Sequence, residues 1–483
     1  MEVTCVHRLT TEWRSATYPF APLPPSKRPT DLSLANSSET PALAVPLQAL
    51  PGQPLRGRLR PPGDKSISHR AFIFGLLTIG ETEISGLLEG EDVLHTGAAC
   101  RALGADITHL GEGHWRVRGA GLGSLLAPRQ PLDFGNAGTG ARLMMGVVAG
   151  SGLTAQFDGD ASLRKRPMRR ILDPLVSMGA EVLAEAAGGR CPILLKGTPE
   201  PAPIDYRSKV ASAQVKSAIL LAGLSSPGRT IVIEPQASRD HTEKMLALFG
   251  AGVVSEPYET YGRKIILEGR PELAPARVIV PTDPSSAAFP LVAALITPGS
   301  DIVIEGMMIN PLRTGLLQTL REMGADIAVL DRREEGGEEV ADLRVRASSL
   351  RGVTVPAARA PAMIDEYPIL AVAAAFATGE TRMAGLSELR VKESDRLAAI
   401  AAGLEAAGVA TTIIGDDLIV EGRDGDVPGG GLAATHLDHR IAMSFLCLGM
   451  AAQKPMAIDD CRMIATSFPT FETAMRNLGA RFS

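Results

Sequence analysis

The chain repeats one combination of hydrophobic and polar positions six times. Each repeat has a segment that is apolar on nearly every side, then an amphipathic segment, a glycine and a strand-like stretch. A segment that is apolar all round predicts a buried helix, whereas apolar residues three and four positions apart predict a helix that covers a core with one face. The six apolar segments are SISHRAFIFGLL, AGTGARLMMGVVAG, SAQVKSAILLAGL, SSAAFPLVAALI, DEYPILAVAAAFA and HRIAMSFLCLGMAA.

The glycines that end the amphipathic segments give the period of the repeat, because successive ones lie 71 to 84 residues apart. A glycine after the last helical turn takes left-handed backbone at little cost, so we predict that each is a helix C-terminal cap. Each repeat is therefore predicted to be a βαβαββ unit, and self-similarity at a fixed period indicates a repeat architecture. The six glycines are Gly104, Gly179, Gly250, Gly324, Gly408 and Gly479.

The six units divide into two groups of three, which predicts two domains in a chain longer than one core usually supports. The break falls at VPTDPSS, residues 280–286. The sixth unit ends at Ser483 without its last strands, and we expect residues 48–60 to supply them from the other end of the chain. The predicted organisation is domain I from residues 46–61 plus 283–483 and domain II from residues 62–282, with a cleft between them.

Composition excludes several classes of protein. The net charge of −5 argues against a surface that neutralises nucleic-acid phosphates. The most apolar segments are shorter than the roughly 20 residues that span a bilayer. Residues 1–45 are rich in Pro and Ser and lack the apolar core of a signal peptide, so we expect a disordered extension, with a transit peptide as the alternative. The five cysteines form no CxxC pair, which favours reduced thiols in a cytoplasmic protein.

Polar residues gather at the start of the predicted buried helices. If these helices run side by side, their N-termini converge on the cleft, where unpaired N–H groups and the helix dipole favour an anion. The Lys and Arg residues at the same ends favour an anionic ligand further. The polar residues in question are Lys65, Ser66, Arg70, Asn136, Thr139, Arg142, Ser212, Gln214, Lys216, Asp365, Glu366, Asp438, His439 and Arg440, and the amphipathic segments add Arg164, Lys165, Arg166, Ser238, Arg239, Lys392, Glu393 and Arg396.

Each of these residues or segments also has a simpler, purely structural interpretation. Each cation alone fits a solvated face or a helix-end ion pair. GNAGTGARL (135–143) fits an anion-binding turn or merely a tight turn. Asp365 and Glu393 fit helix N-caps, or proton-transfer groups set among cations. His69, His241 and His439 have no metal-ligand spacing, so we expect no metal.

Seven segments together resemble the EPSP synthase family, 3-phosphoshikimate 1-carboxyvinyltransferases: PGDKSISHR, FGNAGTGARL, LRKRP, ASAQVKSAILLAGL, MIDEYPILAVAAAFA, RVKESDRL and THLDHRIAMS. The resemblance runs from about residue 48 to the end, and details such as RDHTEKML resemble the bacterial class II branch. It implies the α/β two-domain enolpyruvyl transferase fold, an inside-out α/β barrel with three βαβαββ units and buried parallel helices in each domain. It also implies a monomeric cytoplasmic enzyme of aromatic amino-acid biosynthesis, without metal or organic cofactor, that transfers the enolpyruvyl group of phosphoenolpyruvate to the 5-hydroxyl of shikimate 3-phosphate.

The resemblance also implies roles for individual residues. Asp365 is the expected acceptor of the hydroxyl proton and Glu393 the expected donor to the methylene carbon, with Lys65 and Lys392 as further catalytic residues. Shikimate 3-phosphate is expected at Lys65, Ser66, Arg70, Ser212, Ala213, Gln214, Arg239, Asp365 and Lys392. Phosphoenolpyruvate is expected at Lys65, Asn136, Gly138, Arg166, Gln214, Arg396 and Arg440.

Two positions bear on inhibitor and substrate contacts. Thr466 stands where many family members have a Lys, which puts one phosphate or carboxylate contact in doubt. The herbicide glyphosate binds next to Gly138 in the family, and Ala at that position crowds it. We therefore expect this chain to be more sensitive to glyphosate than its Gly138→Ala variant.

Two other functions were weighed. The sister enolpyruvyl transferase that acts on UDP-N-acetylglucosamine carries a loop cysteine, but the corresponding loop here, FDGDASLRKRP, has none. A non-catalytic anion-binding or RNA-binding protein on a related fold is disfavoured by the acidic net charge and by an aromatic content of 4%. Fold analogy alone does not settle the substrate.

Overall fold

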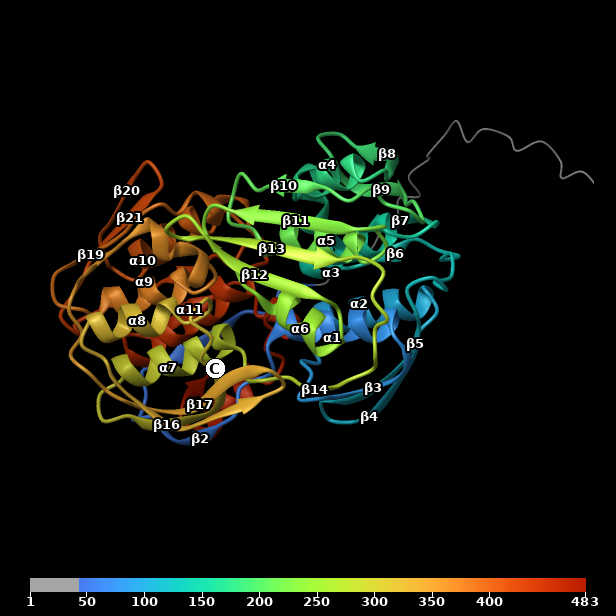
Figure 1. Cartoon of the computed structure of the whole chain (residues 1–483). Coiled ribbons are helices and arrows are strands. Elements are labelled where there is room, and N and C mark those ends of the chain that lie inside the picture. Colours follow the sequence, from blue (N-terminus) through green and yellow to red (C-terminus); the bar gives the residue numbers. More distant parts are fainter. Residues whose placement is uncertain (1–42) are drawn as a thin grey trace, which may run out of the picture. The chain divides into compact units, whose positions relative to one another are not determined.

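A computed structural model of the chain describes residues 43–483. Residues 1–42, and with them most of the predicted N-terminal extension, lie outside the described residues. Residues 44–483 form one compact unit that contains six four-stranded sheets, each with its own helices (Figure 1). The predicted βαβαββ units are confirmed.

Units one to three use residues from the first part of the chain. The first unit has the sheet order β14-β3-β5-β4 and consists of β14 (Arg277–Ile279), α1 (Lys65–Leu77), β3 (Ile79–Ser85), α2 (Glu91–Ala102), β4 (Asp106–Gly111) and β5 (His114–Ala120). The second has the order β6-β7-β9-β8 and consists of β6 (Leu132–Asp133), α3 (Gly138–Ala149), β7 (Thr154–Asp158), the 3-10 helix η1 (Leu163–Lys165), α4 (Arg169–Ser177), β8 (Glu181–Ala186) and β9 (Arg190–Lys196). The third has the order β10-β11-β13-β12 and consists of β10 (Asp205–Arg207), α5 (Ala213–Gly223), β11 (Arg229–Glu234), α6 (His241–Leu248), β12 (Val253–Tyr258) and β13 (Gly262–Glu268).

Units four to six follow the same plan. The fourth has the order β16-β17-β15-β2 and consists of β2 (Arg56–Leu59), α7 (Pro284–Ile296), β15 (Asp301–Met308), α8 (Gly315–Glu322), β16 (Asp326–Glu335) and β17 (Glu338–Arg346). The fifth has the order β18-β19-β21-β20 and consists of β18 (Thr354–Val355), η2 (Ala357–Ala362), α9 (Tyr367–Ala375), β19 (Glu380–Met383), η3 (Ser387–Val391), α10 (Arg396–Ala406), β20 (Thr411–Ile414) and β21 (Asp417–Glu421). The sixth has the order β22-β23-β1-β24 and consists of β22 (Leu432–Ala433), α11 (His439–Ala451), β23 (Met456–Ile458), η4 (Arg462–Thr466), α12 (Phe471–Asn477), β24 (Arg481–Phe482) and β1 (Leu47–Leu50).

The prediction for residues 48–60 was only half right. β1 completes the sixth sheet, pairing antiparallel with β23 and β24. β2 instead runs parallel to β15 as the first strand of the fourth unit, while β14 runs parallel to β3 as the first strand of the first. The segments that follow β2 and β14 lie side by side, since Asp64 N donates to Pro281 O at 2.8 Å and Asp283 N donates to Pro62 O at 3.0 Å. The two segments thus exchange the strands that would otherwise precede α1 and α7.

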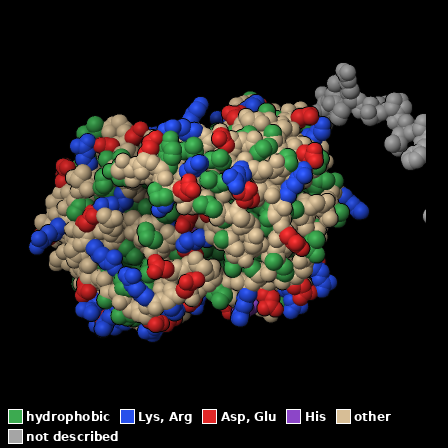
Figure 2. All heavy atoms as spheres, in the orientation of Figure 1, with side chains coloured by type: hydrophobic (Ala, Val, Ile, Leu, Met, Phe, Trp, Pro, Cys, Tyr) green, Lys and Arg blue, Asp and Glu red, His purple; other side chains and the backbone are tan. Residues whose placement is uncertain are grey.

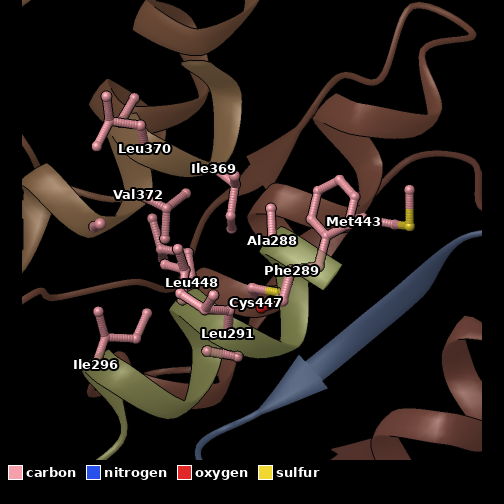
Figure 3. Close-up of a cluster of buried hydrophobic side chains, with 14 of the residues drawn as sticks. Ala288, Phe289, Leu291, Ile296, Ile369, Leu370, Val372, Met443, Cys447 and Leu448 are labelled. Atoms are coloured by element: carbon pink, nitrogen blue, oxygen red, sulfur yellow. Dashed lines mark hydrogen bonds between the residues drawn. The ribbon is translucent and has the colours of Figure 1, made fainter. Parts of the chain in front are cut away.

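The six apolar segments are buried helices, as predicted. Every residue of α7 and of α9 is buried, and α1, α3, α5 and α11 are buried except near their ends. Two separate hydrophobic clusters result, one of which contains α1, α3 and α5 and the other α7, α9 and α11. Figure 3 shows side chains of the second cluster, with Phe289 of α7, Ile369 of α9 and Cys447 of α11 meeting in one core.

The six glycine caps are also confirmed. Each glycine has positive φ, from +78° at Gly408 to +110° at Gly479. The amphipathic helices that end before them pack one face on the buried helices; in α8, for example, Leu316, Leu317 and Leu320 are buried. Each cap turns the chain back so that the next strand pairs within the same sheet.

The face of the molecule in Figure 2 carries both acidic and basic side chains among hydrophobic ones. Within residues 43–483, no helix combines the length and the apolar character needed to cross a bilayer.

Candidate active site

One pocket brings together the N-terminal ends of the six buried helices, or the residues just before them. Its volume is about 340 Å³. Unpaired backbone N–H groups and the positive ends of helix dipoles make such a convergence favourable for anions. The side chains with expected roles that line it are Lys65, Ser66, Arg70, Gly138, Arg166, Ser212, Ala213, Gln214, Arg239, Asp365, Lys392, Glu393 and Arg440.

Asp365, just before α9, lies among four cations. Its carboxylate is 2.5 Å from Arg239 Nη2, 3.1 Å from Arg396 Nη1, 3.7 Å from Lys392 Nζ and 4.0 Å from Arg440 Nη2. Burial alone would raise the pKa of Asp365, but these four cations, Lys392 first among them, hold it well below its ordinary value. Asp365 is therefore ionised at neutral pH and able to accept a proton.

Glu393, just before α10, is the second carboxylate of the pocket. It is 2.5 Å from Arg396 Nη2 and 3.9 Å from Arg166 Nη1. Ser162 Oγ donates to its backbone carbonyl at 3.4 Å. Burial raises the pKa of Glu393, but Arg396, Arg166 and His439 outweigh it and hold that pKa well below its ordinary value. Glu393 is thus also ionised while the pocket holds no substrate.

Neither carboxylate is a helix cap, so that interpretation was wrong. The N-cap of α9 is Glu366, and that of α10 is Asp395, which accepts a hydrogen bond from Ala398 N. The side chains of Asp365 and Glu393 therefore do not cap a helix N-terminus, and their partners are cations. Carboxylates with strongly shifted pKa values that face a pocket are candidates for a functional role.

Two residues with expected roles do not line the pocket. Arg396 is fully buried, and besides the two carboxylates above it donates from Nε to Asp438 Oδ2 at 2.8 Å. Asn136 lies behind Arg166, whose guanidinium donates to its backbone carbonyl at 3.2 Å and to its side-chain oxygen. Asn136 in turn donates from Nδ2 to Asp160 Oδ2 at 2.9 Å. Both residues therefore hold neighbours of the pocket in place.

The first two turns of α1 carry three residues with expected roles, Lys65, Ser66 and Arg70. Lys65 Nζ forms an ion pair with Asp92 of α2. Arg70 donates to Thr242 Oγ1 at 2.7 Å, to Ser217 Oγ at 2.7 Å and to the carbonyl of Ser66 at 2.9 Å. Burial lowers the pKa of Arg70 to about 10, which leaves it charged at neutral pH. Arg70 has no carboxylate partner within 4.0 Å among the described residues, so its charge is available to an anion.

Gln214, in the first turn of α5, is fixed from both ends of its amide. Arg142 Nη1 donates to Gln214 Oε1 at 2.7 Å, and Gln214 Nε2 donates to Thr139 Oγ1 at 3.0 Å. The hydroxyl of Ser212, the N-cap of α5, accepts from Val215 N at 3.5 Å. The SAQ turn therefore enters the pocket in one defined orientation.

Arg313 is a buried residue of the pocket with two ion pairs, and the sequence analysis missed it. It lies just before α8, is 2% exposed, and pairs with Asp283 Oδ1 at 2.9 Å and with Asp64 Oδ2 at 3.4 Å. It also donates to Ser285 Oγ at 3.1 Å, and Ser285 donates to Glu366. Arg239 lies two residues before α6, just as Arg313 lies two residues before α8. A comparison of equivalent positions in the repeated units could therefore have identified Arg313 from the sequence. Other missed lining residues are Asp92, Arg170, Gln236, Asp283, Ser285, Ser387 and Glu388.

The positions of two further residues bear on the expectations. Thr466, in η4, does not line the pocket, and its hydroxyl donates to Met463 O at 2.7 Å. His241, Asp240 and Glu338 form one group of potential metal ligands in residues 43–483. Both carboxylates already accept hydrogen bonds, Glu338 from Lys244 Nζ at 2.5 Å and Asp240 from Asn310 Nδ2 at 2.8 Å.

The chain is similar in sequence and in fold to known proteins over most of its length. A family model of EPSP synthase, 3-phosphoshikimate 1-carboxyvinyltransferase, matches residues 50–475. A 3-phosphoshikimate 1-carboxyvinyltransferase of Methylobacterium sp. (strain 4-46) is 68% identical over 440 residues, which cover 91% of this chain and 98% of the relative. One of Rhodopseudomonas palustris (strain BisA53) is 64% identical over 439 residues, which cover 91% and 98%.

A solved EPSP synthase structure from Acinetobacter baumannii superposes with a TM-score of 0.80 at 42% identity, covering 91% of this chain and 99% of that one. Together, these matches identify the two-domain enolpyruvyl transferase fold. The chain therefore belongs to the EPSP synthase family, and it transfers the enolpyruvyl group of phosphoenolpyruvate to shikimate 3-phosphate in the shikimate pathway.

Proposed function

We propose that the pocket holds shikimate 3-phosphate and phosphoenolpyruvate together, with the roles expected from the sequence for the residues that line it, while Arg396 and Asn136 support those residues from behind. The observation that carries this proposal is the pair of ionised carboxylates, Asp365 and Glu393, set among cations in a pocket formed by six helix N-termini. Each substrate phosphate brings about −1.5 to −2 charges at neutral pH. Arg70 has no carboxylate partner in the described residues, and Arg239 and Arg440 share Asp365, so all three can turn toward an anion.

In the proposed reaction, Asp365 takes the proton of the 5-hydroxyl as its oxygen forms a bond to C2 of phosphoenolpyruvate. Glu393 gives a proton to the methylene carbon, which becomes a methyl group, and the C2 cation that develops is stabilised by the nearby carboxylates. The tetrahedral adduct then loses phosphate from C2, and a proton of the methyl group returns to the Glu393 carboxylate. The double bond is restored, and the hydroxyl proton leaves with the phosphate.

The protonation states set a requirement for this sequence of steps. Asp365 is already a base, whereas Glu393 must acquire a proton before it can act as an acid. A substrate anion beside Arg166 offsets part of the positive charge that lowers the pKa of Glu393. Substrate binding therefore prepares the acid that the first step consumes.

Contacts across the pocket support closure of two domains, residues 46–61 plus 283–483 and residues 62–282. Arg239 reaches Asp365 as above, Gln236 Nε2 donates to Ala358 O at 2.6 Å, and Arg170 Nη1 lies 3.2 Å from Glu388. Closure would exclude water from the reacting groups. From the family resemblance, we further propose a monomeric, cytoplasmic enzyme that glyphosate inhibits at the phosphoenolpyruvate position.

The Glu393→Gln and Asp365→Asn variants test the assigned roles. Each is expected to lower kcat by about a hundredfold to ten-thousandfold, the usual contribution of a positioned acid or base. Glu272→Gln is the control for loss of one carboxylate, because Glu272 is exposed and lies outside the pocket. If either variant kept the kcat of the Glu272→Gln control, the residue concerned would lose its assignment.

A further inference from the structure

A buried cluster of charges lies beneath the pocket and has no part in the proposed chemistry. Lys216 of α5 is 2% exposed, Glu234 at the end of β11 is fully buried, and Glu243 of α6 is 7% exposed. Lys216 Nζ lies 2.7 Å from Glu234 Oε2 and 2.7 Å from Glu243 Oε1. Burial lowers the pKa of Lys216, but the two carboxylates raise it by more, so the lysine stays charged.

This cluster holds the loop between β11 and α6. Ser238 Oγ donates to Glu234 Oε1 at 2.5 Å, and Ser238 N donates to Glu234 Oε2 at 3.4 Å. Lys216 Nζ donates to the carbonyl of Ser238 at 3.4 Å. Both the side chain and the backbone of Ser238 are thus tied to the cluster, and the next residue is Arg239, which reaches into the pocket toward Asp365.

The neighbouring residues of the same two helices hold a second arginine. Ser217 follows Lys216 in α5, and Thr242 precedes Glu243 in α6. Both accept hydrogen bonds from Arg70, and their hydroxyls lie 2.6 Å apart. The α5–α6 pair therefore presents two arginines to the same part of the pocket, one through hydroxyls and one through buried charges.

A buried ionic cluster is a poor source of stability, because desolvation offsets most of the attraction between the charges, and apolar residues of similar size often stabilise a protein equally well. In some proteins a buried ionic cluster instead fixes the local geometry, because each buried charge must keep its partner. We propose that Lys216, together with Glu234 and Glu243, is a positioning residue for Arg239 and acts through Ser238 on the affinity for shikimate 3-phosphate. This inference rests on the proposed role of Arg239 in binding that substrate.

The test is a double-mutant cycle between Lys216→Met and Arg239→Met, with KM for each substrate and kcat measured in every variant. Lys216→Met alone is expected to raise KM for shikimate 3-phosphate by roughly tenfold, the loss expected when one charge-assisted contact is weakened, and to change KM for phosphoenolpyruvate little. In the Arg239→Met background, Lys216→Met should have no further effect on KM, because the residue through which it acts is already gone.

Two further variants separate positioning from a general loss of structure. Ile219→Ala creates a cavity in the same helix, so it should lower the free energy of unfolding without a selective rise in KM. Adding Glu243→Gln to Lys216→Met removes the second of two facing carboxylates, so it should return KM toward the wild-type value. If Lys216→Met does not fold, Glu234→Gln in the same cycle weakens the cluster while keeping its shape.

The outcomes separate the positioning role of Lys216 from the proposed role of Arg239 in binding shikimate 3-phosphate. If Arg239→Met alone leaves KM for shikimate 3-phosphate unchanged, the proposed role of Arg239 is wrong, and this inference falls with it. Suppose instead that Arg239→Met raises KM for shikimate 3-phosphate. The positioning role alone is then refuted if Lys216→Met leaves that KM unchanged, or if Lys216→Met raises it by the same factor in the presence and in the absence of Arg239. An equal rise in KM in Ile219→Ala would likewise reduce Lys216 to a structural residue.

Discussion

The Gly138→Ala substitution tests the pocket directly, because the added methyl group would lie too close to the side chain of Arg166. A Cβ atom at this position would lie 2.7 Å from Arg166 Nη1 and 3.4 Å from Arg142 Nη1. Ordinary contact begins at 3.4 Å, so the Arg166 nitrogen must retreat by about 0.7 Å in Gly138→Ala. The backbone itself tolerates alanine, because Gly138 does not have positive φ.

Arg166 cannot retreat freely. Its guanidinium donates to Asn136 O at 3.2 Å and to Ser162 Oγ at 3.2 Å. A shift of 0.7 Å stretches either bond past hydrogen-bond range if it points away from the acceptor. Weakening one such bond costs about 1 to 2 kcal/mol, which predicts a rise of roughly tenfold in KM for phosphoenolpyruvate.

Glyphosate should be affected more than the substrate, because the same methyl group crowds the inhibitor as well as displacing Arg166. The assay is steady-state phosphate release, with KM for phosphoenolpyruvate and the glyphosate inhibition constant measured in wild type and in Gly138→Ala. Gly123→Ala is the matched control, since its Cβ would meet nothing within 4 Å. An unchanged inhibition constant, or an unchanged KM, would refute the reasoning.

Three other predictions follow from charges and backbone geometry. Substrate anions should raise the lowered pKa of Glu393, so at about pH 6 wild type should take up more protons than Glu393→Gln on binding shikimate 3-phosphate with inorganic phosphate, and the difference should shrink at about pH 8. Calorimetry in two buffers measures the uptake of each protein; the comparison removes the titration of the ligand phosphates, whose second pKa is about 6, and equal uptake by both proteins would refute the shift. Arg313→Met leaves two buried aspartates without their cation and should lower the free energy of unfolding by about 3 to 5 kcal/mol, with partial recovery on adding Asp283→Asn; urea unfolding that shows no loss would contradict the ion-pair assignment. Gly324 has a φ of +94°, so Gly324→Ala should cost about 1 kcal/mol, and an equal stability of Gly324→Ala and Gly123→Ala would argue against the cap.

The repeat and its buried helices were predictable because their signals are local. Apolar residues on every side of α7 and α9 require burial, and the glycine after each amphipathic helix marks a left-handed cap. The convergence of helix N-termini followed from stacking equal units. The exchange of β2 and β14 was not predictable, because each strand has the same local pattern in either sheet, and only the packing of residues far apart in sequence selects its partner.

In the site, too, features that depend on a short segment of sequence were predictable, whereas contacts between distant segments were not. Asp365 and Arg239 were found because each stands at the start of a helix in a recognisable segment. The pairing of Lys65 with Asp92 and the hidden position of Arg396 depend on tertiary contacts that no spacing encodes. Lys216 was singled out as a polar residue of the pocket, but it points instead to two buried glutamates.

Every residue role proposed above depends on the transfer reaction, so the most direct measurement is phosphate release from the purified protein with shikimate 3-phosphate and phosphoenolpyruvate. Each substrate alone, and UDP-N-acetylglucosamine in place of shikimate 3-phosphate, are the controls. We predict release only when both substrates are present, together with an equal amount of the enolpyruvyl ether. Release with the nucleotide sugar instead, or no release from folded protein, would contradict the account.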